Sequence, residues 1–133
     1  MDKAERARMY EEFLRAEGYQ PEVDEDGDVR FKKEGGLYFI DVDERDEQFF
    51  RLCFPNFWSV ESDEERGRAL AACDYSNSLS KVAKVYLVHN THAWAAIELF
   101  FAEPEEFRGV FERCIGALQN GVRNFVKRMQ EEQ

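Results

Sequence analysis

The feature that most constrains the fold is a long amphipathic pattern near the C-terminus. Pro104 suits the first turn of a helix, and the acidic residues Glu103, Glu105 and Glu106 favour the positive end of the helix dipole. Apolar side chains then recur at three- and four-residue steps over roughly 26 residues, or ~39 Å of helix. The pattern predicts one helix that forms a principal wall of the core. Its apolar members are Phe107, Val110, Phe111, Cys114, Ile115, Leu118, Val122, Phe125, Val126 and Met129.

Short runs of apolar residues precede this pattern and predict antiparallel strands. The second run alternates most clearly, with Tyr38, Ile40 and Val42 on one side. Glycine or polar turns flank it, which predicts a three-stranded meander, because such short connections join antiparallel neighbours. Two further strands are joined by a turn at Asn90 and Thr91. The expected strands are residues 29–33, 37–43, 48–54 (closed by Pro55), 81–89 and 93–101.

Two more helices complete the expected order of elements. Residues 4–17 have apolar side chains at helical spacing and stop at Gly18. Ser62 and Glu65 form a capping box that begins a second helix, expected to run to about residue 75 and to end at Asn77. The order helix, three strands, helix, two strands, helix predicts an α+β fold with an antiparallel sheet packed against helices. The length of 133 residues predicts a single domain spanning 1–133.

Charge and cysteine content narrow the classes of partner and compartment. The formal net charge of -10 repels phosphate backbones and anionic lipids, so we expect neither nucleic acid nor a membrane surface as partner. No apolar run reaches the ~18 residues that a bilayer-spanning helix needs. Cys53, Cys73 and Cys114 are odd in number and lie in apolar surroundings, which indicates buried thiols in a reducing compartment. We expect a cytoplasmic protein.

An acidic turn invites a metal-binding interpretation. Asp24, Asp26 and Asp28 alternate beside Gly27, as in a calcium loop. The loop of an EF-hand, however, needs its glycine after the third acidic ligand and a glutamate at its twelfth position. Here the glycine comes too early, and counting twelve from Asp24 reaches Gly35. We therefore favour a solvated turn over a metal site.

The remaining polar residues show no catalytic pattern. His89 and His92 flank the expected hairpin turn, but two histidines without a third ligand nearby are typical of a surface turn. Cys73 beside Asp74 lies on an apolar helical stripe, which favours packing over a nucleophile. The chain has no phosphate-binding loop, dinucleotide motif or nucleophile elbow. We expect no catalytic, cofactor or metal site and rank an enzyme, assembled from a histidine and a distant carboxylate, as the last of three hypotheses.

The second face of the strands is the most informative anomaly. A free sheet face is normally polar, yet the positions opposite the helix-facing ones are largely apolar. They are Leu37, Phe39, Phe49, Cys53, Trp94, Ala96 and Phe100. Such a patch implies a cover, supplied by a second copy, by a client, or by the chain's own segment 57–60 folding over. As protein-binding residues to test first we select Phe39, Phe49, Trp58 and Trp94.

Several motifs together resemble the YbjN-like family of bacterial proteins. They are Phe13-Leu14 and Gly18-Tyr19 before the acidic turn, the strand at 37–43, and Asn77 followed by Lys84 at the fourth strand. The resemblance implies the fold of type III secretion chaperones, a cytoplasmic protein described as a regulator of sensory transduction, and a fold that dimerises and holds client segments. It implies no catalytic residues, and the end of the chain matches no dedicated client-binding motif.

These observations predict a non-enzymatic, protein-binding domain, a chaperone-like or regulatory adaptor that forms a homodimer. Its apolar sheet face or grooves would accept partner surface, and an extended client would gain main-chain hydrogen bonds at an exposed strand edge. The alternative is a small-ligand sensor in which aromatic side chains line an internal pocket.

Overall fold

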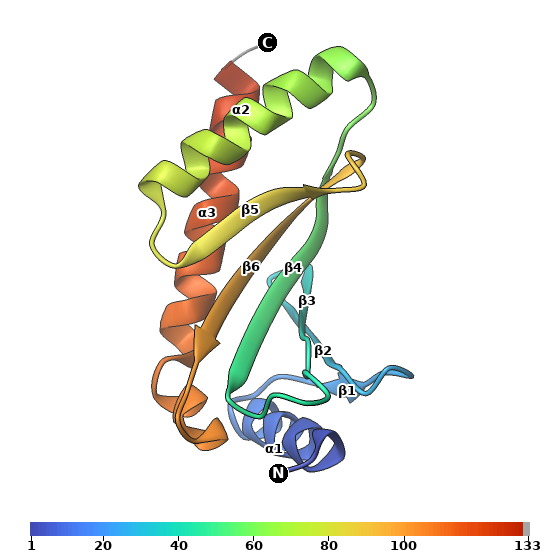
Figure 1. Ribbon diagram of the computed structural model, residues 1–133, viewed down its shortest axis with the longest axis vertical. Coiled ribbons are helices and arrows are strands. Elements are labelled where there is room, and N and C mark those ends of the chain that lie inside the picture. The colour runs from blue at the N-terminus through green and yellow to red at the C-terminus, as the bar shows by residue number, and fades with distance from the viewer. Residues whose placement is uncertain (132–133) are drawn as a thin grey trace. The chain divides into compact units, whose positions relative to one another are not determined.

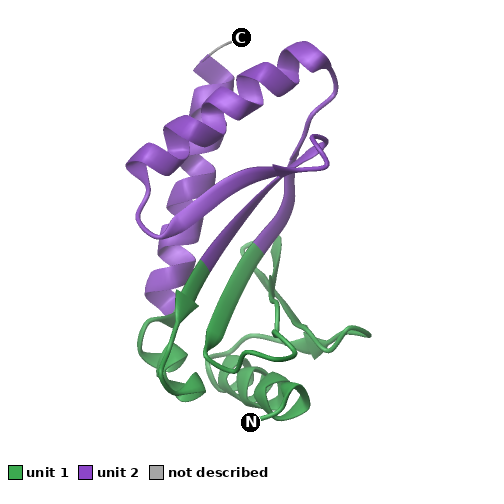
Figure 2. Ribbon diagram, in the orientation of Figure 1, with its two compact units in different colours: residues 1–53, 98–111 green, residues 54–97, 112–133 purple. Residues whose placement is uncertain are grey.

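The computed structural model describes residues 1–131 and alternates helices with strands as the sequence predicts (Figure 1). Two compact units share the chain (Figure 2): residues 1–53 with 98–111, and residues 54–97 with the described residues from 112 on. In chain order the elements are α1 (Lys3–Ala16), β1 (Glu22–Val23), β2 (Val29–Lys33), β3 (Gly36–Ile40), β4 (Phe49–Ser59), α2 (Asp63–Leu79), β5 (Ala83–Val88), β6 (His92–Phe100), the 3-10 helix η1 (Pro104–Gly109) and α3 (Phe111–Glu131).

The sheet confirms the predicted α+β class. Its strand order is β1-β2-β3-β4-β6-β5, and the pairs β1/β2, β2/β3, β3/β4 and β5/β6 are antiparallel. The hairpin between β2 and β3 turns at Glu34 and Gly35, whose φ angles of 50° and 83° suit the tight turn expected there. The two-residue strand β1 was not predicted, because two residues show no periodicity.

The first unit is built around aromatic side chains. Tyr10 of α1 contacts Phe107 of η1 and Phe50 of β4, with ring centroids 4.8 and 6.0 Å apart. Phe31 of β2 stacks on Tyr38 of β3 at 5.6 Å. Four helix-facing positions of β3 and β4, Tyr38, Ile40, Phe50 and Leu52, are buried as the alternation predicts, whereas Phe54 is half-buried. Edge-to-face and stacked pairs of this kind add to the apolar burial that holds α1 and η1 on the sheet.

A buried arginine fixes α1 to the loop that leads into β4. Arg6 is 1% exposed. Its Nη2 donates to the carbonyl of Asp43, and its Nε donates to the carbonyl of Met1 at 3.3 Å. Because both acceptors are backbone carbonyls, the guanidinium joins the start of the helix to the loop without using an acidic side chain.

The second unit joins α2 and α3, which cross in Figure 1. Ser76 of α2 is buried and donates its hydroxyl to the carbonyl of Gly121 on α3 at 2.7 Å. A Cβ at Gly121 would lie 3.2 Å from Cβ of Ala83 on β5. At this glycine β5 therefore approaches α3 closely, and a residue without a Cβ fits there.

Pro55 does not close the third strand, contrary to expectation. β4 continues to Ser59, so segment 57–60 is mostly strand and not a covering loop. β3 pairs with β4 where Phe39 and Ile40 lie opposite Cys53 and Leu52. Pro55 lies beyond those pairs, where a missing backbone N–H removes no hydrogen bond to β3.

Three other boundaries also differ from the prediction. Helix α2 continues past Asn77 to Leu79, because the Asn77 side chain bonds to β5 instead of competing for its own backbone. The β5–β6 turn is centred on His89 and Asn90, both with positive φ, and not on Asn90 and Thr91. The C-terminal pattern is interrupted at Val110, where η1 ends and α3 follows.

Candidate functional site

The outer face of the first unit is the candidate site. We use "outer face" for the side chains of β3, β4 and β6 that point away from the buried positions Tyr38, Ile40, Phe50 and Leu52, together with Asp41, which continues the alternation of β3. Backbone pairing continues past β3, since the N–H of Asp41 donates to the carbonyl of Arg51 at 2.9 Å. The outer face consists of Leu37, Phe39, Asp41, Phe49, Arg51, Glu98 and Phe100.

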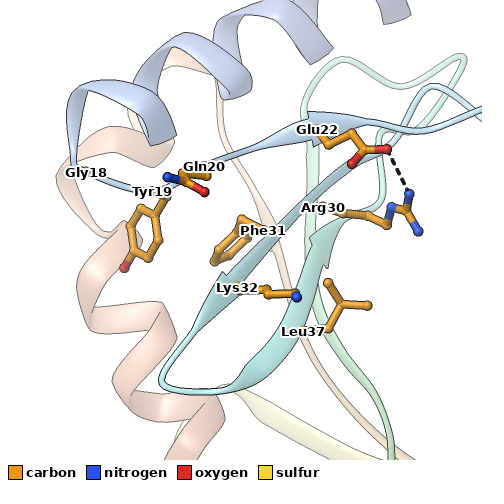
Figure 3. Close-up of a pocket in the computed structure, with 8 residues that line it drawn as sticks. All are labelled: Gly18, Tyr19, Gln20, Glu22, Arg30, Phe31, Lys32 and Leu37. Atoms are coloured by element: carbon orange, nitrogen blue, oxygen red, sulfur yellow. Dashed lines mark hydrogen bonds and ion pairs between the residues drawn. The ribbon is translucent and has the colours of Figure 1, made fainter.

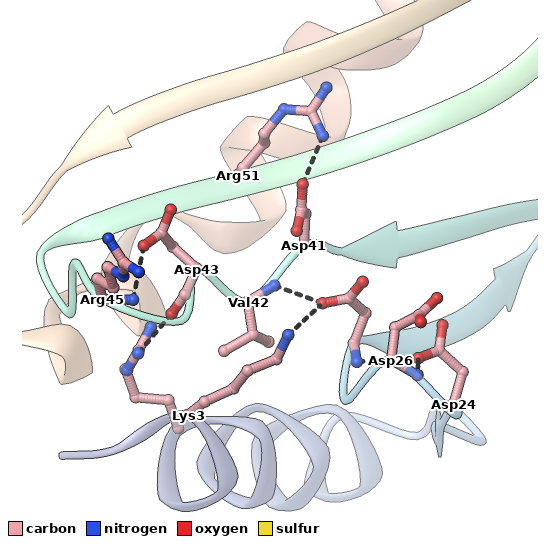
Figure 4. Close-up of polar contacts among 10 residues, drawn as sticks. Lys3, Asp24, Asp26, Asp41, Val42, Asp43, Arg45 and Arg51 are labelled. Atoms are coloured by element: carbon pink, nitrogen blue, oxygen red, sulfur yellow. Dashed lines mark hydrogen bonds and ion pairs between the residues drawn. The ribbon is translucent and has the colours of Figure 1, made fainter.

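Its centre is a row of three charged side chains from three segments. Arg51 Nη1 donates to Asp41 Oδ2 at 2.8 Å, and Arg51 Nε donates to Glu98 Oε2 at 3.2 Å; Figure 4 shows the first of these pairs. The Arg51 side chain is 18% exposed, against 40% for Asp41 and 30% for Glu98. The cation is therefore the most covered member of the row, and solvent reaches the carboxylates more readily.

Apolar side chains lie on both sides of this charged row. The rings of Phe49 and Phe100 have centroids 5.7 Å apart, and Phe100 is 76% exposed. On the other side, Leu37 is 42% exposed and Phe39 is half-buried. The outer face thus combines large exposed apolar groups with accessible carboxylate oxygens.

Two residues expected on the second face of the strands are small and fully buried. Cys53 and Ala96 each have no exposed surface. Burial raises the pKa of the Cys53 thiol to about 12, because the thiolate would lose its hydration. All three cysteines are buried and free, as predicted, and none has the lowered pKa that marks a reactive thiol.

The structure distributes the four residues selected from the sequence over both units. Phe39 and Phe49 belong to the outer face of the first unit. Trp58 lies in the second unit, where its ring meets Phe125 of α3 at 5.8 Å and its Nε1 donates to Glu65 at 3.2 Å. Trp94 lies on β6 of the same unit and donates from Nε1 to Asn56 at 2.9 Å. Trp58 thus contacts α2 and α3 of its own unit. Phe39 and Phe49, in contrast, both lie on the outer face.

The charged row was missed because the sequence does not reveal register. Along the chain, Arg51 lies 10 residues from Asp41 and 47 residues from Glu98. Only the pairing of β3 with β4, and the neighbouring position of β4 and β6 in the sheet, bring them together. The sequence does show that each of the three segments has one charged residue among its apolar outer positions, and this pattern could have indicated a charged row.

The acidic turn uses its carboxylates to fold the turn itself. Asp24 Oδ1 accepts from the backbone N–H of Asp26 at 2.9 Å and of Asp28 at 3.0 Å. Asp28 Oδ1 accepts from the N–H of Val42 at 2.9 Å and lies 3.8 Å from Lys3 Nζ (Figure 4 labels Asp24, Asp26, Val42 and Lys3). Ligand atoms of the three acids lie within 4.8 Å of one another. The sequence predicted a solvated turn; the structure shows in addition that two of its aspartate side chains bond to backbone N–H groups.

The histidines do not join a ligand cluster in the part of the chain that the structure describes. His89 is exposed in the turn with a φ of 54°, and His92 Nδ1 lies 3.0 Å from Thr91 Oγ1. Burial raises the pKa of Asp28, but this carboxylate bonds to a backbone N–H and faces no histidine among its contacts. These arrangements are those of structural turns.

A cleft of ≈ 560 Å³ lies where α1 leads into β1 (Figure 3). Gly18, Tyr19 and Gln20 form one side, and residues 30–32 with Leu37 form the other. Arg30 Nη2 is held by Glu22 Oε1 at 3.1 Å. The Tyr19 ring packs on Phe31 with centroids 5.1 Å apart. This cleft lies at the surface, and two of its charged side chains, Arg30 and Glu22, are paired with each other.

The interior aromatic residues of the first unit pack against one another. Phe13 contacts Phe107 and Phe111 at 4.9 and 5.3 Å, and Phe31 contacts Phe111 at 5.9 Å. Phe107 and Phe111 have no exposed surface. Contacts of this kind add to the apolar burial of the first unit's core.

Comparisons with known proteins bear on the fold. No family model and no curated protein matches the sequence. A similar solved structure is the crystal structure of an uncharacterized protein from Methanothermobacter thermautotrophicus, with a TM-score of 0.58 and 15% identity over 96% of this chain and 98% of that chain. At that identity the likeness shows the fold alone. Within residues 1–131, no helix combines the length and the apolar content needed to cross a bilayer.

Proposed function

We propose that this protein is a non-enzymatic binding domain, a chaperone-like or regulatory adaptor, whose outer face accepts the surface of another protein chain. The observation that carries the proposal is the Phe49–Phe100 pair, in which the Phe100 ring is mostly in contact with water. Apolar groups that a docked partner removes from water provide the main favourable free energy of association. The half-buried Phe39 and the exposed Leu37 extend the same surface.

The wider expectations from the sequence belong to the same proposal. A second copy of the chain is one candidate partner, so the protein would act as a homodimer. Buried, reduced thiols suit a cytoplasmic protein, and the net charge of -10 disfavours nucleic acid and anionic membranes as partners. The resemblance to the YbjN-like family, with its client-holding, chaperone-like fold, supports a regulatory or chaperone role.

Site-specific photocrosslinking in cells tests the proposal. A photoreactive phenylalanine analogue would replace Phe100 in one variant and Leu70 in a matched control. Leu70 is 51% exposed on α2 and belongs to the second unit, whereas the outer face belongs to the first. We expect discrete protein adducts from position 100 and none, or only a diffuse background, from position 70.

The mass of the adduct separates the possible partners. An adduct of twice the chain mass identifies a second copy, which sedimentation of the purified protein would then confirm. An adduct of different mass identifies another protein. Absence of any adduct at position 100 in a folded, expressed variant, with the same result at position 49, would refute the proposed binding face.

A further inference from the structure

We propose that the cleft between residues 18–20 and β2 binds a small organic carboxylate with an apolar body (Figure 3). The inference goes beyond the proposed function, because it concerns a small molecule and not the surface of another protein. It follows from three properties of the cleft: the gap at the edge of the sheet that forms it, the cation on its wall, and the fixed aromatic ring on the opposite side.

The cleft opens where β1 stops pairing with β2. The last pair of their register on this side is Glu22 with Arg30. Continued by two residues, the same antiparallel register would place Gln20 opposite Lys32. That pair does not belong to the described sheet, and both residues line the cleft instead. The gap has a volume of ≈ 560 Å³, which is within the range of ~300–1,000 Å³ that is usual for small-ligand sites.

The wall of the cleft carries a cation without a counter-ion. Within residues 1–131, Lys32 has no carboxylate partner. Its unit has twice as many acidic as basic residues, and other cations of that unit, such as Lys3 and Arg51, do have carboxylate partners. The register explains the difference, since the residue opposite Lys32 on β3 is Leu37 and the nearest outer position of β2 is Arg30. An ammonium group between an apolar side chain and a second cation favours an anion beside it.

Arg30 provides further donors, and the charge of the lining favours a carboxylate. A guanidinium has five N–H groups, and the ion pair from Arg30 Nη2 to Glu22 Oε1 at 3.1 Å uses one of them. Arg30, Lys32 and Glu22 are the charged residues of the lining, so its formal charge is one positive unit. A carboxylate balances this charge, whereas a phosphate monoester would bring a second negative charge.

Tyr19 forms a fixed wall for the apolar body. Its ring packs edge-to-face on Phe31 with centroids 5.1 Å apart, and its hydroxyl accepts from Lys33 Nζ at 3.1 Å. A wall that is already held in place loses little conformational entropy when a ligand binds. Leu37 is 42% exposed on the other side, and Figure 3 shows the Lys32 amine beside it. The apolar body would lie between Tyr19 and Leu37, with its carboxylate at Lys32.

Three small molecules test the inference. Phenylacetate has both the anion and the apolar body, phenylacetamide has the same shape without the charge, and acetate has the charge without the ring. Each is titrated into the isotopically labelled protein, and amide chemical shifts give the affinity and the location. We expect phenylacetate to bind with a dissociation constant on the order of millimolar and at least about tenfold more tightly than the other two molecules. The shifts should be centred on residues 18–20 and 30–32.

Two charge variants locate the anion. Lys32→Gln should weaken phenylacetate about fivefold, whereas Lys127→Gln, the same charge change on α3 of the second unit, should leave its affinity within about twofold. Both lysines are exposed, so neither change removes a buried contact. Added salt should weaken phenylacetate on the unmodified protein more than on Lys32→Gln, because the screened ion pair is absent from the variant.

Three results would overturn the inference. Equal binding of phenylacetate and phenylacetamide would show an apolar cleft that does not select an anion. Equal loss of affinity in Lys32→Gln and Lys127→Gln would assign the effect to net charge. Phenylacetate shifts that do not saturate by about ten times the expected dissociation constant, or that saturate only away from the cleft, would show that the cleft is not a ligand site. None of these results bears on the crosslinks at positions 49 and 100, so the proposed function stands or fails separately.

Discussion

The side-chain amide of Asn77 makes two hydrogen bonds with the backbone of Val85. Asn77 Oδ1 accepts from the Val85 N–H at 2.8 Å, and Asn77 Nδ2 donates to the Val85 carbonyl at 3.1 Å. β5 is the last strand of the sheet, with β6 as its neighbour on the other side. The Asn77 side-chain amide therefore takes the place of a neighbouring strand's peptide group. It satisfies the hydrogen bonds of the Val85 N–H and carbonyl at the open edge of β5.

Replacing Asn77 should destabilise the fold and free the edge of β5. We expect Asn77→Ala to lower the free energy of unfolding by about 1–2 kcal/mol, since both hydrogen bonds are lost. Urea denaturation with an unchanged m-value would measure this loss. Sedimentation at increasing concentration should show more self-association, because the Val85 peptide group becomes available for pairing.

Ser78 provides the matched control for Asn77. Its hydroxyl donates to the Tyr75 carbonyl within the same helix, and the residue is exposed. We expect Ser78→Ala to change stability by less than about 0.5 kcal/mol. Equal stabilities of the two variants would show that the Asn77 bonds contribute nothing measurable.

Two glycines of α3 should respond in opposite directions to a larger side chain. A Cβ at Gly121 would lie 3.2 Å from Ala83 Cβ and 3.5 Å from Val85 Cγ2, whereas a Cβ at Gly116 would meet no atom within 4 Å. We expect Gly121→Val to cost about 1–3 kcal/mol through overpacking, and Gly116→Ala to stabilise by about 0.5–1 kcal/mol through helix propensity. Thermal unfolding monitored by circular dichroism would rank them, and destabilisation by both would contradict the assignment.

The outer-face charges should be coupled to one another. Arg51→Met removes the cation and leaves Asp41 and Glu98 without their shared partner, so we expect a loss of about 1–3 kcal/mol. In a double-mutant cycle, the loss should be smaller when Glu98→Gln is already present. Additive losses measured by urea denaturation would mean that Arg51 stabilises the fold through packing and not through the ion pair.

Helices and strands whose limits depend on a pattern within one segment were predicted correctly from the sequence. The positions of α1, β2 and the start of α2 follow from helical spacing, alternation and the Ser62 capping box, whose side chain accepts from the Glu65 N–H. Each signal concerns neighbours along the chain, where propensity and capping decide the outcome.

Features that depend on tertiary neighbours were not predictable. Pro55 is compatible with β4 because the pairs that β3 makes with β4 lie before it, and Asn77 stays helical because its side-chain amide bonds to both the N–H and the carbonyl of Val85. The Asp41–Arg51–Glu98 row likewise depends on register between strands. A sequence pattern gives the two faces of a strand but not which residues of other strands lie beside them.

Buried thiols should make the fold less stable at alkaline pH. The pKa of Cys53 is about 12 in the folded protein, and that of Cys73 about 11, against an ordinary value of 9.0, because burial disfavours the thiolate. Burial also raises the pKa of Tyr10 from 10.0 to about 12. From about pH 9 upward, the unfolded chain therefore releases protons that the folded chain retains. The free energy of unfolding must fall as pH rises through that window, and it is unaffected by these groups below it.

Cys53→Ala isolates the largest part of this dependence. At neutral pH the variant should lose only the packing of a small buried side chain, about 1 kcal/mol. Between about pH 9 and 11 its stability should fall less steeply than that of the unmodified protein, by about 1–2 kcal/mol over the interval, since one titrating thiol is gone. Urea midpoints at neutral pH and across that interval measure the difference. Parallel curves for the two proteins would show that the Cys53 thiol titrates normally in the folded state, which a group with no exposed surface should not do.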